Sequence, residues 1–131
     1  MNTTYFLNAV ANQMFLEPPS SIQFYLGLSK TEPSLDGGGV TEPGANTGYI
    51  RTKIEHLSLL NNGVVTNTSD IMFDESTAEW GDMKYFVIFD ALNAGNLLMF
   101  GKLSHIRRVE VATQVVVEAG TLNLCVTNPV G

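Results

Sequence analysis

Three carboxylates share one glycine-rich stretch of the chain. Glu32, Asp36 and Glu42 lie within TEPSLDGGGVTEPG (residues 31–44), where three consecutive glycines follow the aspartate. Carboxylates and backbone carbonyls are ligands that calcium prefers, although the Asp-x-Asp-x-Asp-Gly spacing of a dedicated calcium loop is absent. A phosphate cradle is excluded, because no Lys-Ser or Lys-Thr follows the glycines and the acidic side chains repel an anion. We expect this stretch to contact a neighbouring subunit, with calcium binding as the alternative.

Residues that serve as nucleophiles, bases or zinc ligands are few and scattered. His56, His105 and Cys125 have no paired spacing, whereas tetrahedral zinc needs about four ligands. No Gly-x-Ser-x-Gly elbow occurs, and the single cysteine lies in an alternating run that is typical of a half-buried strand. The sequence therefore predicts no enzymatic activity, no cofactor and no metal of the zinc type.

Acidic residues also surround the single tryptophan. The group resembles a glycosidase carboxylate pair in composition, but solvated carboxylates at a corner between strands explain it equally well. Its members are Asp74, Glu75, Glu79 and Asp82. We favour the solvated corner.

Arg107 and Arg108 form the most basic spot of the chain. The net charge is -6, with 7 Lys plus Arg against 13 Asp plus Glu, so a nucleic-acid partner is not expected. A guanidinium can hold a carboxylate through two hydrogen bonds, which makes paired arginines common in protein interfaces. We expect either an exposed charged turn at this position or a salt-bridged contact between subunits.

Aromatic side chains provide a further possible binding function. Tyr25, Tyr49 and Trp80 have flat rings of the kind that stack on sugars, and each is also a normal core residue. For Trp80 we expect burial at the entrance of a strand.

The length and composition of the chain indicate one folded domain whose surface contacts other proteins. A chain of 131 residues suffices for a single core, so we expect one domain over residues 1–131. Only 15% of the residues are charged, against about a quarter in an average domain, which indicates a surface that meets protein. No apolar run approaches the roughly 20 residues of a membrane span, and the N-terminus lacks the features of a signal peptide. We expect no membrane insertion.

Two segments precede most of the strands. Residues 1–16 place Tyr5, Phe6 and later apolar residues at helical spacing, which predicts a short N-terminal helix that packs on the core or on a neighbouring subunit. Residues 29–48 are rich in glycine and proline and predict a long loop between the first two major strands.

The rest of the chain predicts strands. In residues 22–29 and 49–55 apolar residues alternate with other residues. In the second run Arg51, Lys53 and Glu55 are expected on a charged face that meets either water or a partner. Asn61-Asn62-Gly63 predicts a tight turn between strands at 57–60 and 64–67. Further strands are expected at 71–73, 83–90, 97–103, 109–117 and 121–127. Residues 83–90 are almost continuously apolar, so this strand should be central, with 97–103 as its antiparallel partner. The pattern predicts an all-β fold, an antiparallel β-sandwich of jelly-roll type.

Three blocks of sequence carry a resemblance when they are taken in order. The first runs from Phe24 to Arg51 and contains LGLS, TEP, DGGG, VTEP and GYIR. The second is TAEWGDMKYFVIFD (residues 77–90), and the third is GNLLMFGKL (residues 95–103), with AGTL (residues 119–122) opening the last strand. In this order and spacing the blocks resemble a family of small tailed-bacteriophage virion proteins, the phage tail fibre or tail proteins.

The resemblance implies a non-enzymatic structural component of a tailed-phage virion. A tail-associated fibre, tip or baseplate module is the first expectation; capsid decoration, as head cement or head fibre, and recognition of a host glycan are the alternatives. The implied partners are other virion proteins of the tail or capsid. The chain is expected to form a homo-oligomer, a trimer first, because virion positions are symmetric. Synthesis in the bacterial cytoplasm would precede its incorporation into the virion.

Overall fold

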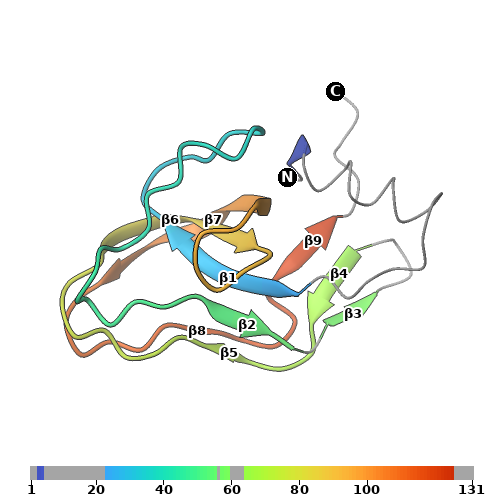
Figure 1. The fold of residues 1–131 in the computed structure, drawn as a ribbon. Coiled ribbons are helices and arrows are strands. Elements are labelled where there is room, and N and C mark those ends of the chain that lie inside the picture. Colours follow the sequence, from blue (N-terminus) through green and yellow to red (C-terminus); the bar gives the residue numbers. More distant parts are fainter. Residues whose placement is uncertain (1–2, 5–22, 56, 60–63, 126–131) are drawn as a thin grey trace.

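The fold consists of antiparallel strands joined by long loops (Figure 1). The computed structural model describes residues 3–4, 23–55, 57–59 and 64–125. Its strands are β1 (Phe24–Ser29), β2 (Thr52–Ile54), β3 (Leu57–Leu59), β4 (Val64–Asn67), β5 (Ile71–Met72), β6 (Gly81–Phe89), β7 (Leu97–Val109), β8 (Val116–Val117) and β9 (Asn123–Cys125). No helix within the described residues is long and apolar enough to cross a membrane.

A four-stranded sheet in the order β2-β1-β6-β7 is the centre of the molecule. All of its pairings are antiparallel, and β6 lies between β1 and β7, with Val87 opposite both Gly27 and Phe100. Two smaller sheets accompany it, in the orders β3-β4-β9 and β5-β8. The prediction of a central strand at residues 83–90 with an antiparallel partner at 97–103 is confirmed, as is the antiparallel pairing of the strands at 57–60 and 64–67.

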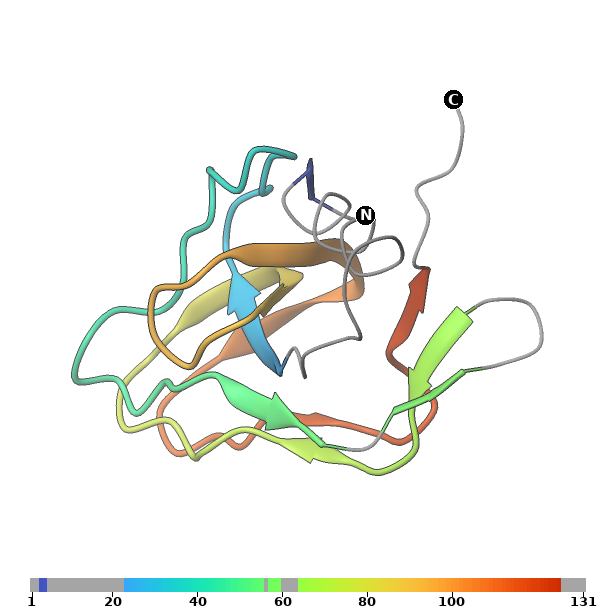
Figure 2. The ribbon, with the colours of Figure 1, turned by 45° about the vertical axis from the view of Figure 1, so that its right-hand side comes forward.

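The main core fills one face of the four-stranded sheet. Leu26, Ile88 and Leu98 of this sheet belong to the same buried cluster as Ile71 and Phe73, at and just after β5. β2, β5 and β8 lie on one side of the β1–β6–β7 sheet in both ribbon views (Figure 2). The apolar contact between these parts removes large side chains from water and is the main source of stability.

The opposite face of the sheet is covered by the long loop after β1. Val87, Phe89, Leu97 and Phe100 form a second buried cluster there, and Val40 of the loop packs against it. This cover explains why β1 departs from simple alternation: Gly27 and Ser29 are buried together with Leu26 and Leu28.

Three strand predictions are wrong in their extent, and one of them is the strand expected at 97–103, which continues to Val109 as β7. The strand expected at residues 49–55 covers Thr52–Ile54, and Arg51 is buried within the chain instead of facing water or a partner. The strand expected at 109–117 is replaced by the end of β7 at Val109, a turn in which Ala112 has a φ of 61°, and the short β8. Apart from Thr3 and Thr4, the predicted helix at 1–16, with Tyr5 and Phe6, lies outside the described residues, as does the turn at 60–63. The antiparallel all-β class is confirmed, and the jelly-roll sandwich stays a prediction.

Candidate functional site

A mostly buried ion pair between Glu42 and Arg51 joins the second half of the long loop to the residue that precedes β2. The guanidinium of Arg51 donates from Nη2 to Glu42 Oε1 at 2.7 Å and from Nε to Glu42 Oε2 at 3.0 Å. The side chain of Arg51 is 8% exposed and that of Glu42 is 20% exposed. Two parallel charge-assisted bonds of this kind fix the relative position of both backbones.

Arg51 also binds the turn between β6 and β7. Its Nη1 donates to the carbonyl oxygens of Ala91 at 2.9 Å and of Ala94 at 2.7 Å, and its Cζ lies 3.5 Å from the ring centroid of Phe89. The turn therefore has two of its backbone acceptors satisfied by a side chain from another element. Such pairing offsets the cost of burying an arginine, which is large when the charge has no partners.

Tyr49 extends the ion pair into the core. Its Oη donates to Glu42 and accepts a hydrogen bond from the Leu28 amide at 3.1 Å. Burial, followed by the hydrogen bond to Glu42 and the charge of that carboxylate, raises the pKa of Tyr49 far above its usual range. The phenol is therefore held in its neutral form.

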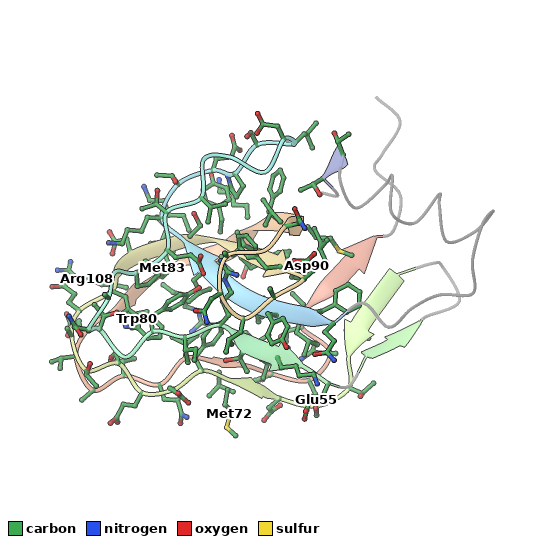
Figure 3. The ribbon with its side chains drawn as sticks, in the orientation of Figure 1. Glu55, Met72, Trp80, Met83, Asp90 and Arg108 are labelled. Atoms are coloured by element: carbon green, nitrogen blue, oxygen red, sulfur yellow. The ribbon has the colours of Figure 1, made fainter. Side chains whose placement is uncertain are left out.

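Aromatic residues that pack around Tyr49 also hold the long loop in position. The Tyr49 ring meets Trp80 edge-on with centroids 5.2 Å apart and stacks on Phe73 at 6.3 Å. Trp80 Nε1 donates to the Thr47 carbonyl at 2.8 Å, and the Thr77 amide donates to the same oxygen at 2.9 Å. Figure 3 shows Trp80 inside the molecule, where it is 1% exposed. Its predicted burial at a strand entrance is confirmed.

The first half of the loop has its own internal bonds. Ser29 Oγ donates to the Thr31 carbonyl at 2.7 Å and accepts from the Thr41 amide at 2.9 Å, which closes the base of the loop. At the tip, Asp36 accepts from Ser34 Oγ and from the Gly38 amide. The hydrogen bond from Ser34, followed by that from Gly38, lowers the pKa of Asp36 below its usual value.

A cavity of about 330 Å³ opens beside the ion pair. Residues of the long loop and of the β6–β7 turn line it, among them Glu42, Ile50, Arg51, Leu92 and Asn93. Ile50 and Leu92 are partly exposed apolar side chains at this position. The polar groups of Glu42 and Arg51 bind each other and backbone carbonyls. Their main role is therefore to hold the conformation of the loop.

The carboxylates singled out in the sequence separate into different roles. Glu42 binds Arg51 and Tyr49, Asp36 binds its own loop tip, and Glu32 is exposed. Within the described part of the chain, no group of three His, Cys, Asp or Glu side chains is placed to hold a metal ion. The shared acidic site that calcium would need is therefore not formed by these three residues.

Arg107 and Arg108 lie in β7, not in a turn. They pair across the sheet with Met83 and Asp82 of β6, and the Arg108 side chain is 67% exposed at the end of the molecule (Figure 3). Arg108 lies 3.7 Å from both Glu79 and Glu110, which are also exposed. Exposed pairs at this distance contribute little to stability.

The aromatic residues considered for sugar stacking are placed mainly inside. Trp80 and Tyr49 belong to the packed ring group: Trp80 is buried, whereas Tyr49 is partly buried and also lines the cavity. Tyr25 is partly exposed, and its Oη donates to Gln23 at 3.0 Å.

Arg51 was not predicted as a site residue, because strand alternation assigned it to a face that meets water or a partner. One signal was present: Val40-Thr41-Glu42-Pro43 and Gly48-Tyr49-Ile50-Arg51 are both pieces of the resemblance, and each carries one member of an opposite charge pair. In a chain with few charges, an acidic and a basic residue at the two ends of one loop are candidates for direct contact.

Together, the fold and this site define a small antiparallel β-protein whose long surface loop is fixed by buried polar contacts. Residues 2–125 match the family model Gp80, described as Podophage GP4 fiber I protein gp80, and the chain belongs to this family. The resemblance to tailed-phage fibre proteins is thereby confirmed. A search of curated proteins gave no match. Membership in a podophage fibre family is consistent with a structural component of the virion.

Proposed function

We propose that this chain is a non-enzymatic structural subunit of a tailed-phage virion, located in the tail as part of a fibre, tip or baseplate. The observation that carries the proposal is the family match over residues 2–125. The site geometry supports it, because Glu42, Tyr49 and Arg51 bind one another and the backbone rather than an open reaction centre.

The long loop is the part of the molecule that we assign to contact with a neighbouring virion protein. The ion pair and Tyr49 fix its base, while Leu35 at the tip is 45% exposed beside Asp36. A fixed loop loses less conformational entropy on binding than a free one, so the contact gains affinity. Removal of residues 36–39 should leave the fold intact and reduce incorporation into particles.

We propose further that the chain acts as a homo-oligomer, with a trimer as the first candidate, and that the four-stranded sheet and the β5–β8 pair are the two layers of a sandwich. Symmetry of the virion supports the first part, because identical subunits then share one contact. Sedimentation of the purified chain at several concentrations measures the oligomer, and a monomer throughout would contradict it.

The location is tested by separating heads from tails of purified particles. We expect an antibody to this chain to detect it in the tail fraction. Detection in the head fraction would contradict the tail assignment and favour capsid decoration instead.

A further inference from the structure

Among the described residues, no strand pairs with the outer edge of β7 over its second half. β7 is the last strand in the order β2-β1-β6-β7, and its 13 residues exceed the 9 of its partner β6. Within the described part of the chain, residues 102–108 form no backbone hydrogen bond outside the β6–β7 ladder. A row of unpaired amides and carbonyls is a template on which a further strand can form.

The start of β7 already accepts hydrogen bonds from Thr3. Thr3 donates from its amide to the Leu98 carbonyl at 2.8 Å and from Oγ1 to the Leu97 carbonyl at 2.6 Å. In both ribbon views the short N-terminal piece lies near this end of β7 (Figure 2). The carbonyls of Leu97 and Leu98 therefore point outward and accept donors.

A wide bulge shapes the free half of the edge. Tyr85 pairs with Lys102 and Met83 pairs with Arg107, so Lys84 stands opposite the four residues from Leu103 to Ile106. Ile106 is 61% exposed, and Ser104 and His105 are exposed as well. Bulges of this kind end or redirect pairing and recur where a strand has a binding function.

The charged side chains within β7 are all basic, and one of them, Arg108, lies 3.7 Å from Glu79 and Glu110 outside the strand. Residues 97–109 contain Lys102, Arg107 and Arg108 and no Asp or Glu, within a chain of net charge -6. Two copies of this edge would bring like charges together, which is destabilising in a paired sheet. Cations and a bulge on an edge strand oppose pairing with an identical edge, whereas the cations attract a strand of opposite charge.

We propose that the Lys102–Arg108 edge of β7 binds an acidic, extended segment of a neighbouring virion protein by strand addition. Backbone hydrogen bonds would supply part of the affinity, the three cations would select the acidic partner, and Ile106 would contact an apolar side chain of that segment. The identity of the partner as a virion protein rests on the proposed function.

The test uses the full chain and a synthetic peptide of alternating glutamate and threonine, long enough to pair with all of residues 102–108. Threonine favours strands, and glutamate supplies the charge. We expect the peptide to slow amide hydrogen exchange at Lys102–Arg108. A peptide of alternating lysine and threonine should bind about tenfold more weakly or not at all, because it meets like charges.

Matched variants separate the charge from the fold. The double variant Arg107→Glu, Arg108→Glu should lose affinity for the acidic peptide by about tenfold, as expected for two exposed charge pairs. Lys53→Glu reverses an exposed charge on β2, the opposite edge of the same sheet, and should leave binding unchanged. Circular dichroism spectra equal to the parent's confirm that the variants remain folded.

Three results would overturn the proposal: no binding of the acidic peptide, equal binding of both peptides, or binding without slower exchange at Lys102–Arg108. Equal binding of single-stranded DNA of the same length would also overturn it, because the edge would then be a general site for polyanions. A failure here would leave the proposed function intact if the chain is still found in the tail fraction of particles.

Discussion

Glu42 in the long loop and Arg51 just before β2 are joined by two hydrogen bonds of 2.7 and 3.0 Å. The pair is mostly buried, and Arg51 bonds in addition to the carbonyls of Ala91 and Ala94. One side chain thus connects the long loop, the start of β2 and the β6–β7 turn.

Replacing Arg51 by methionine should cost about 3 to 5 kcal/mol in the free energy of unfolding, because it leaves the buried carboxylate of Glu42 without its partner. Urea unfolding measures the change. Lys53→Met replaces an exposed side chain two residues away and serves as the control. It should change the free energy of unfolding by less than about 0.5 kcal/mol.

The pair should also be coupled in a double-mutant cycle. Once Arg51 is methionine, the further change Glu42→Gln should cost much less than it does in the parent, since the charge that it removes has already lost its partner. Additive losses would show that the two residues stabilise the loop independently.

The raised pKa of Tyr49 predicts that the protein loses stability at alkaline pH. In the unfolded chain a tyrosine ionises near pH 10, whereas burial and Glu42 raise the pKa of the folded residue well above this value. Above about pH 10 the unfolded state therefore binds fewer protons, so stability is full below this pH and falls by up to about 1.4 kcal/mol per pH unit above it.

The variant Tyr49→Phe isolates this effect. It should be less stable than the parent at pH 8, because the Leu28 amide loses its acceptor. Its stability should fall less steeply between pH 10 and 12. Parallel curves for the two proteins over this range of pH would contradict the assignment.

Gly27 is required for the close approach of Tyr49 to β1. A methyl group at this position would lie impossibly close to Tyr49 Oη and 3.1 Å from Val87 Cγ2. Gly27→Ala should therefore destabilise the fold by about 1 to 3 kcal/mol. Gly44→Ala is the matched control, because a methyl group there would meet no atom within 4 Å. Thermal unfolding of the two variants gives the comparison.

Asp36 should titrate at an unusually low pH because of Ser34. The lowered pKa means that the loop-tip contact stabilises the folded state above about pH 4, the usual value for an aspartate, and that this contribution is lost as the pH falls through the lowered value. In Ser34→Ala the carboxyl should titrate closer to the usual value. Carbon NMR of the Asp36 carboxyl measures both, and an unchanged titration would exclude Ser34 as the main cause.

The sequence predicted the strands that depend on local pattern and missed contacts that depend on distant residues. The β6–β7 pairing followed from two long apolar runs joined by a turn, and Trp80 followed from its place before a strand. Arg51 was assigned to a face that meets water or a partner because its neighbours alternate, but Glu42 and the carbonyl of Ala91 reach it from other parts of the chain. Non-local partners of this kind leave no periodic signal.

The length of β7 was missed for a related reason. His105, Arg107 and Arg108 have the composition of an exposed turn, and strand periodicity breaks at the bulge opposite Lys84. An edge strand has one side free of pairing, so it tolerates charges and irregular backbone that a central strand would not. Composition therefore indicated a turn where the chain continues as a strand.

The central claim is that this chain is a structural subunit of a phage tail. Immunogold labelling of intact particles tests it most directly, with an antibody raised against the purified chain and particles of an unrelated phage as the control. We predict gold at the tail, on the fibres, tip or baseplate. Gold distributed over the head, or no labelling above the control, would contradict the claim.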